Sequence, residues 1–189
     1  MYFYKLTRGS RTVFATASDV PILNPDYEET TREEYESFTG RPIQTEEELR
    51  EVKLREIGEA CSAAIYAGVD VGGAHYSLTE HDQTEIMAQY ATVKEGAAAV
   101  PYHADGELCR MYPAEEFAAL AQAATEHVFY QRTYCNHLNA WIRRAGLEEL
   151  KGITYGAELP EDLEQSMMEI LAEVEAEKTI TVGGMDDAV

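Results

Sequence analysis

The chain has 189 residues, with 35 acidic side chains against 15 basic ones and a formal net charge of -20. This excess of negative charge argues against binding to nucleic-acid phosphates, which requires clustered Lys and Arg. It also argues against docking on an anionic membrane. Apolar residues make up 45% of the chain, enough for a packed core.

The sequence shows no sign of export or membrane insertion. No uncharged apolar run approaches the ~18 residues of a membrane span. The first residues, MYFYKLTRGS, lack the apolar core of a signal peptide. The 3 cysteines follow no disulfide framework, which indicates free thiols in a reducing compartment. We therefore expect a soluble protein of the cytoplasm.

Residues 1–44 are predicted to form a small N-terminal unit. Runs of aromatic and β-branched residues flank Arg8-Gly9-Ser10, a pattern typical of a β-hairpin. Residues 19–29 contain two prolines and are interpreted as a loop. A capping box beginning at Thr30 or Thr31 then starts a short helix that ends at Gly40.

Residues 45–146 are predicted to form an α+β domain. Thr45 and Glu48 form a capping box that begins a helix running to about Tyr66. A hairpin at 69–78 follows, with Gly72-Gly73 at its turn. Thr79 and Asp82 begin the next helix, which runs to about Lys94.

A second hairpin is expected at 99–112, with Asp105-Gly106 as a two-residue turn. Pro113 suits the start of a long helix from about Ala114 to Arg144. At 100° per residue, one face of this helix is apolar and is the predicted core stripe. The stripe consists of Phe117, Leu120, Ala121, Ala124, Val128, Cys135, Leu138 and Ile142.

The neighbouring arc of the long helix is amphipathic and aromatic. It is the edge of the core, covered by the two hairpins, or it is a partner surface, where Tyr and Trp are enriched. We favour the first interpretation for the two tyrosines, and Trp141 fits either. The arc consists of His127, Tyr130, Tyr134, His137 and Trp141.

The remainder is predicted as an acidic helical extension over 147–178, with its last helix over 161–177, and a flexible tail over 179–189. The expected fold is therefore α+β: an N-terminal β-hairpin, then a mainly helical domain with two inserted hairpins and one long helix.

The stretch PYHADGELCRMY brings together the side-chain types of a cysteine hydrolase. With a two-residue turn, Tyr102 faces Cys109, so His103 and Cys109 point to opposite sides of the hairpin. A three-residue loop would place both on one side. Asp105 is interpreted as a turn residue, and the cysteines and histidines lack ligand spacing such as CxxC or HxxxH. We expect no catalytic residue, no metal and no cofactor.

Several segments in order carry a resemblance: ACSAAIYAGVDV, AHYSLTEHDQTEI, VPYHADGELCRMYPAEEF and HVFYQRTYCNHLNAWI. They resemble a family of unknown function in tail-module proteins of bacteriophages and prophages, encoded beside tail-fibre genes. The resemblance covers about residues 55–145. It implies virion assembly and protein binding, not catalysis.

The expected function is that of a tail accessory protein that binds a tail-fibre or baseplate protein. Its expected location is the bacterial cytoplasm during assembly, with the virion tail as an alternative. One alternative is a tail-fibre assembly chaperone that leaves the particle. Another is an acidic inhibitor that mimics DNA, which requires carboxylates in two phosphate-spaced rows.

Overall fold

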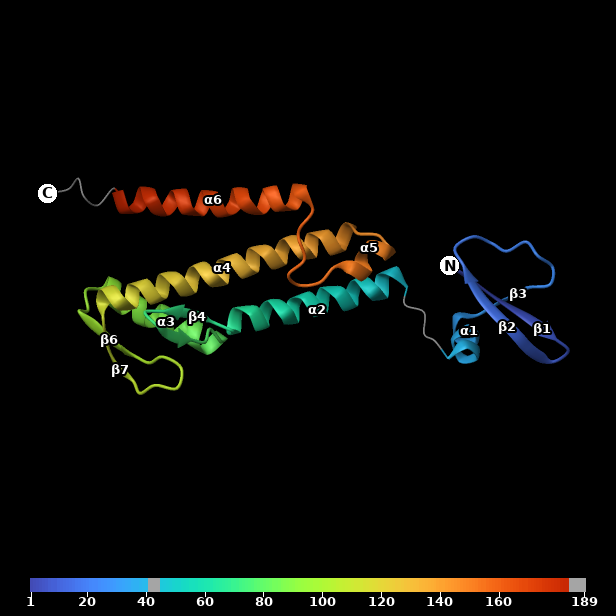
Figure 1. The fold of residues 1–189 in the computed structure, drawn as a ribbon, viewed down its shortest axis with the longest axis horizontal. Coiled ribbons are helices and arrows are strands. Elements are labelled where there is room, and N and C mark those ends of the chain that lie inside the picture. The colour runs from blue at the N-terminus through green and yellow to red at the C-terminus, as the bar shows by residue number, and fades with distance from the viewer. Residues whose placement is uncertain (41–44, 184–189) are drawn as a thin grey trace. The chain divides into compact units, whose positions relative to one another are not determined.

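The computed structural model describes residues 1–40 and 45–183, and the side chains up to Glu177. It has the α+β fold that the sequence predicts, with an N-terminal hairpin and one long helix (Figure 1). The chain divides into two compact units, Met1–Glu48 and Leu49–Val189.

The N-terminal unit is a three-stranded antiparallel sheet with one helix. The predicted hairpin is β1 (Tyr2–Arg8) with β2 (Arg11–Ser18), and β1 also pairs with β3 (Glu28–Thr30), giving the order β2-β1-β3. The prediction of a loop over 19–29 is therefore wrong for residues 28 and 29, which belong to β3. The helix α1 (Arg32–Thr39) begins and ends as predicted, because Thr31 accepts a hydrogen bond from the Glu34 amide and Gly40 adopts a left-handed conformation.

The larger unit is built around α4 (Ala114–Arg144), which is unbroken as predicted. Hydrogen bonds join α4 to α2 through Cys61 and to α6 through Ser166, so α4 lies between these two helices (Figure 1). The predicted capping boxes at Thr45 and Thr79 are both present. The other helices are α2 (Glu46–Tyr66), α3 (Glu80–Lys94), α5 (Leu147–Gly152) and α6 (Glu161–Gly183).

The two inserted hairpins are also present, and both contact α4. The first is β4 (Val69–Val71) with β5 (Ala74–Tyr76), and the second is β6 (Ala99–Tyr102) with β7 (Arg110–Pro113). Aromatic side chains of the second hairpin pack on the N-terminal end of α4, where Tyr102 and Tyr112 each make an edge-to-face contact with Phe117. Such pairs add to the stability that burial provides.

The predicted core stripe of α4 is confirmed. Phe117, Leu138 and Ile142 are fully buried, and only Val128 of the stripe is partly exposed. The core also extends past residue 146, where the domain was expected to end. Leu150 of α5 and Ile153 after it are fully buried in the same cluster. Residues 147–153 are therefore part of the domain, not an appendage.

The C-terminal helix is longer than the sequence predicts. We expected it to end at residue 177 and be followed by a flexible tail over 179–189, but α6 continues to Gly183. Residues 184–189 of that expected tail lie outside the described residues.

Candidate interaction surfaces

The hairpin that carries His103, Asp105 and Cys109 has a longer loop than expected. Tyr102 pairs with Arg110, not with Cys109, so residues 103–109 form the loop. The prediction of a two-residue loop is wrong, because the side chain of Asp105 forms hydrogen bonds outside its own hairpin. Its carboxylate accepts hydrogen bonds from the amide and the hydroxyl of Ser77, just beyond the other hairpin.

These contacts join the two hairpins. The Asp105 amide also donates to the His75 carbonyl oxygen over 2.9 Å. The hydrogen bond from the Ser77 hydroxyl lowers the pKa of the Asp105 carboxyl below its ordinary value. The arrangement fixes the 103–109 loop against the end of the first hairpin.

The histidines near this loop also have structural partners. His75 Nδ1 lies 2.8 Å from the Asp70 carboxylate, which raises the pKa of His75. The His103 ring stacks on Tyr102 with centroids 5.6 Å apart, and Cys109 is exposed. Among residues 1–40 and 45–177, no three His, Cys, Asp or Glu side chains come together as a metal site would require.

The amphipathic arc of α4 is largely covered, but not by the hairpins as we expected. The Tyr134 hydroxyl donates to the Ala157 carbonyl oxygen over 2.6 Å, and its ring meets Tyr155 edge-to-face. His137 is buried, 8% exposed, and its Nε2 lies 3.4 Å from the Ser166 hydroxyl of α6. The covering segment is therefore the chain after α5 together with α6.

The other three members of the arc differ from one another. His127 Nε2 lies 2.9 Å from the Ala64 carbonyl oxygen at the end of α2. The Trp141 indole donates to the Glu149 carboxylate of α5. Tyr130 remains 48% exposed, so the interpretation of this residue as covered is wrong. Only Tyr130 keeps its side chain largely available to a partner.

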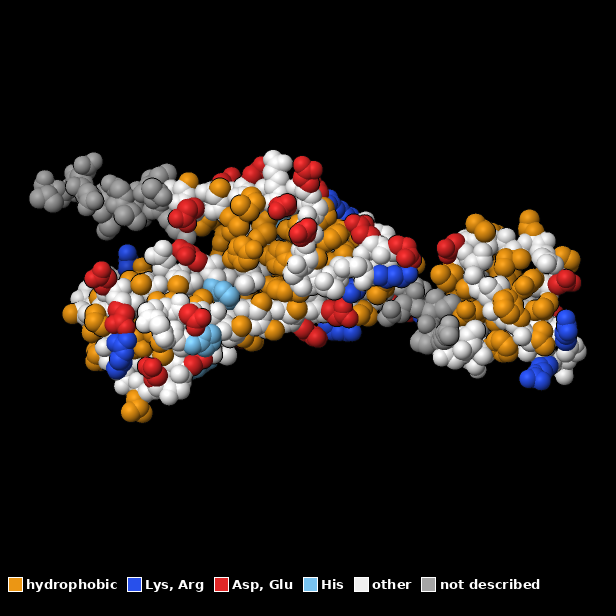
Figure 2. Space-filling view, in the orientation of Figure 1, with side chains coloured by type: hydrophobic (Ala, Val, Ile, Leu, Met, Phe, Trp, Pro, Cys, Tyr) orange, Lys and Arg blue, Asp and Glu red, His pale blue; other side chains and the backbone are white. Residues whose placement is uncertain are grey.

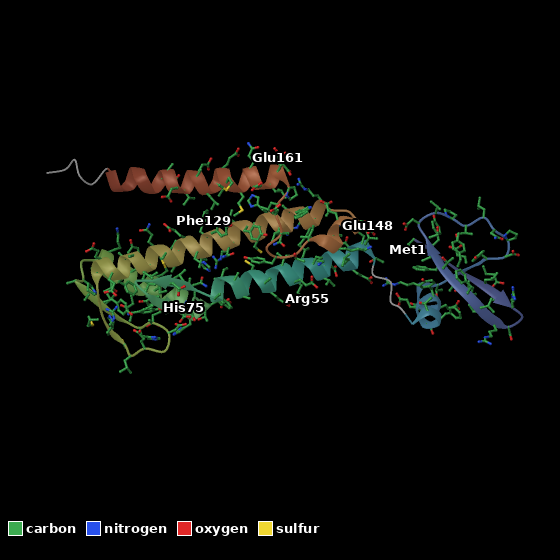
Figure 3. The ribbon with its side chains drawn as sticks, viewed as in Figure 1. Met1, Arg55, His75, Phe129, Glu148 and Glu161 are labelled. Carbon is green, nitrogen blue, oxygen red and sulfur yellow. The ribbon has the colours of Figure 1, made fainter. Side chains whose placement is uncertain are left out.

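A groove that the sequence did not reveal lies between α3 and α4. Its apolar wall combines side chains of both helices, among them Phe129, which is labelled in Figure 3. The volume is about 290 Å³. Met87 at its edge is 53% exposed although the neighbouring Ile86 is buried. The lining residues are Gln83, Ile86, Met87, Ala124, Thr125, Val128, Phe129 and Arg132.

Further apolar side chains lie open on α6. Met168 is 59% and Ile170 is 38% exposed, while Met167 beside them is buried. Figure 2 shows hydrophobic side chains gathered over the part of this unit where α4 and α6 lie. Exposed apolar side chains that gather on one surface are typical of interaction sites.

The helices also differ from membrane-spanning segments. Within the described part of the chain, none of them combines the length and the apolar character needed to cross a bilayer.

Comparison with known proteins gives one match. No curated protein and no solved structure matches the chain. A family model described as a domain of unknown function, DUF4376, matches residues 48–163. The match starts at the beginning of α2 and ends at the first turn of α6, so it includes α5 and the buried Ile153. It covers more than half of the 189 residues, and the chain belongs to the DUF4376 family.

Proposed function

We propose that the protein is an accessory protein of a bacteriophage or prophage tail module that binds a tail-fibre or baseplate protein. The observation that carries the binding role is the apolar groove between α3 and α4. The tail context comes from the sequence resemblance described above. The expected action is binding alone, without catalysis.

The groove has the composition of a protein-binding site. Its floor is apolar, and Met87 gives it an exposed, flexible thioether side chain that adapts to different partner surfaces. An amphipathic helix or loop that lays an apolar side chain into such a groove gains most of its affinity from that burial.

The charge at the rim indicates the chemistry of the partner segment. Arg132 is exposed and lines the groove. No ion pair of Arg132 occurs among the residues that the structure describes, although acids outnumber bases more than two to one. A partner segment with an apolar side chain next to a carboxylate can bury the apolar side chain against the groove floor and pair the carboxylate with Arg132.

The test is co-purification with tail-fibre and baseplate proteins of the same phage or prophage. Met87→Asp places a charge at the groove, and we expect it to weaken binding by about tenfold or more. Leu108→Asp is the control, because Leu108 is 91% exposed on the β6–β7 loop and does not line the groove. Retention of full affinity by Met87→Asp, or no binding by the wild type, contradicts the proposal.

The assembly chaperone is the second candidate, and the same binding data fit it. Purified particles separate the two: an accessory protein is found in them by mass spectrometry at a fixed ratio to the fibre. A chaperone is found only with unassembled fibre protein in the lysate.

A further inference from the structure

Within the described residues, the N-terminal sheet has two unpaired edges, formed by β2 and β3. β2 pairs with β1 on one side and with no strand on the other, within the described residues. An open edge presents a row of backbone N–H and C=O groups that can pair with another extended chain. Proteins usually block such edges with charges, prolines or very short strands.

The two edges of this sheet are protected very differently. The β3 edge is 3 residues long and carries Glu28 and Glu29. The β2 edge is 8 residues long, and from Thr12 to Ser18 it contains no charge and no proline. Charges and prolines therefore do not block this edge of β2, and the β-bulge in its pairing with β1 lies at Val13, so residues 14–18 form the regular part of the edge.

The faces of the sheet beside β2 are already occupied. On one face Phe3, which pairs with Ala17, contacts Tyr35 of α1 with ring centroids 5.6 Å apart. On the other face the Phe14 ring meets Tyr27 edge-to-face. Phe14 and Val13 are nevertheless 48% and 42% exposed. The open part of the unit is thus the strand edge, with two apolar side chains beside it.

The charge of this hairpin is opposite to that of the whole chain. Residues 1–18 contain three basic residues and no acidic one, although the chain carries -20 overall. Arg8 and Arg11 pair with each other across the turn of the hairpin. Neither guanidinium forms an ion pair in the described part of the chain, and Figure 2 shows basic side chains at the margin of this unit.

We propose that β2 is a docking edge for an extended, carboxylate-bearing segment of the partner tail protein, which adds a fourth strand beside it. Backbone hydrogen bonds along the edge supply affinity, and Arg8 and Arg11 select for acidic side chains on the added strand. A second copy of this chain is the less suitable occupant, because pairing two β2 edges brings two positively charged hairpins together. The proposal rests on the proposed function and specifies a second contact with the same partner.

The experiment compares two double variants with the same change in charge. Arg8→Glu/Arg11→Glu reverses the charge at the β2 hairpin. Lys94→Glu/Arg143→Glu reverses two exposed charges on α3 and α4 and serves as the control. Circular dichroism and thermal melts establish that both variants are folded before binding is measured.

We expect the hairpin variant to bind the tail-fibre or baseplate protein about tenfold or more weakly, with little dependence on salt. The control variant should retain most of the affinity and the salt dependence of the wild type. In the wild-type complex, hydrogen exchange of β2 amides should become slower than in the free protein.

Four results overturn the inference. Full affinity of Arg8→Glu/Arg11→Glu alongside weak binding of Met87→Asp removes the β2 contact and leaves the proposed function standing. Unchanged hydrogen exchange in β2 excludes strand addition even if the arginines matter. A wild-type dimer in sedimentation that dissociates on Arg8→Glu/Arg11→Glu identifies a second copy as the occupant. If the wild type binds no tail protein at all, the proposed function and the inference fail together.

Discussion

The backbone of Gly68 lies directly against the carbonyl group of Tyr76. A Cβ atom at Gly68 would lie 2.8 Å from the Tyr76 carbonyl carbon and closer still to its oxygen. Gly68 also adopts a φ of +79°, in the region that L side chains rarely occupy. This contact sets where the chain leaves α2 and enters the first hairpin.

Gly68→Ala should therefore strongly destabilise the larger unit. The positive φ alone costs ~1–3 kcal/mol, and the backbone overlap adds to that cost because a carbonyl group cannot rotate away as a side chain can. Gly73→Ala is the control: its φ is +84°, but a Cβ there meets open space. Chemical denaturation should show a loss for Gly73→Ala close to the conformational cost, and a clearly larger loss for Gly68→Ala. Equal losses would show that the close approach is unimportant.

Burial of the segment after α4 leads to a second prediction. Leu138 of α4 and Leu150 of α5 are both fully buried, so Leu138→Ala and Leu150→Ala should each cost ~2–5 kcal/mol. Leu108→Ala should change the free energy of unfolding by ~0.5 kcal/mol or less, since Leu108 is exposed. A chain ending at residue 146 should fail to give a cooperative melt. A stable 146-residue form would restore the boundary that the sequence suggested.

Elements with strong local signals were predictable from the sequence. The capping residues Thr31, Thr45 and Thr79 and the turn at Gly72-Gly73 act within a few positions along the chain. Their effect needs no tertiary context, so helix starts and the first hairpin agree with the structure. The strand β3 was missed because its 3 residues, Glu28–Thr30, carry no alternating apolar pattern and pair with β1 only through the fold.

The interaction surfaces were harder to predict, because they depend on which helix covers which face. The sequence shows the helical arc that contains Tyr130 and Tyr134, but it does not show which segment of the chain packs on that arc. Ile153, Tyr155 and Ala157 alternate with more polar residues, a period-2 pattern typical of an extended segment along a core. That pattern was the available signal. Nothing in the sequence distinguishes buried Ile86 from exposed Met87, so the groove appears only in the structure.

Alanine substitutions of the two tyrosines of that arc should affect the melting temperature differently. Tyr134→Ala removes the hydrogen bond to Ala157 and the contact with Tyr155, and it should lower the melting temperature of the isolated protein. The expected loss is ~3 kcal/mol, near the range for a buried aromatic residue. Tyr130→Ala, one helical turn away, should leave the melting temperature nearly unchanged, because its side chain is 48% exposed. A Tyr134→Ala protein that melts like the wild type would show that the segment after α5 does not cover α4.

The contact between Ser77 and Asp105 predicts a pH dependence. The Ser77 hydroxyl holds the pKa of Asp105 below its ordinary value of 3.8. Since the folded pKa is the lower one, this contact stabilises the protein fully above about pH 4 to 5 and the stabilisation is lost as the pH falls through the folded pKa. Ser77→Ala should return the pKa of Asp105 toward 3.8 in an NMR titration. The difference in melting temperature between wild type and Ser77→Ala should shrink at acid pH; a difference that grows there would contradict the assignment.

The three cysteines should react at very different rates. Cys109 is exposed on the β6–β7 loop, whereas Cys61 and Cys135 are buried between α2 and α4. Burial raises the pKa of the Cys135 thiol to about 12, and a thiol without thiolate character is a poor nucleophile. A maleimide reagent should therefore label one cysteine of the native protein, and all three after unfolding. Cys109→Ser should abolish the native labelling and leave both the melting temperature and partner binding unchanged, because the Cys109 side chain is not part of the core. Loss of binding at an unchanged melting temperature would instead assign Cys109 a functional role.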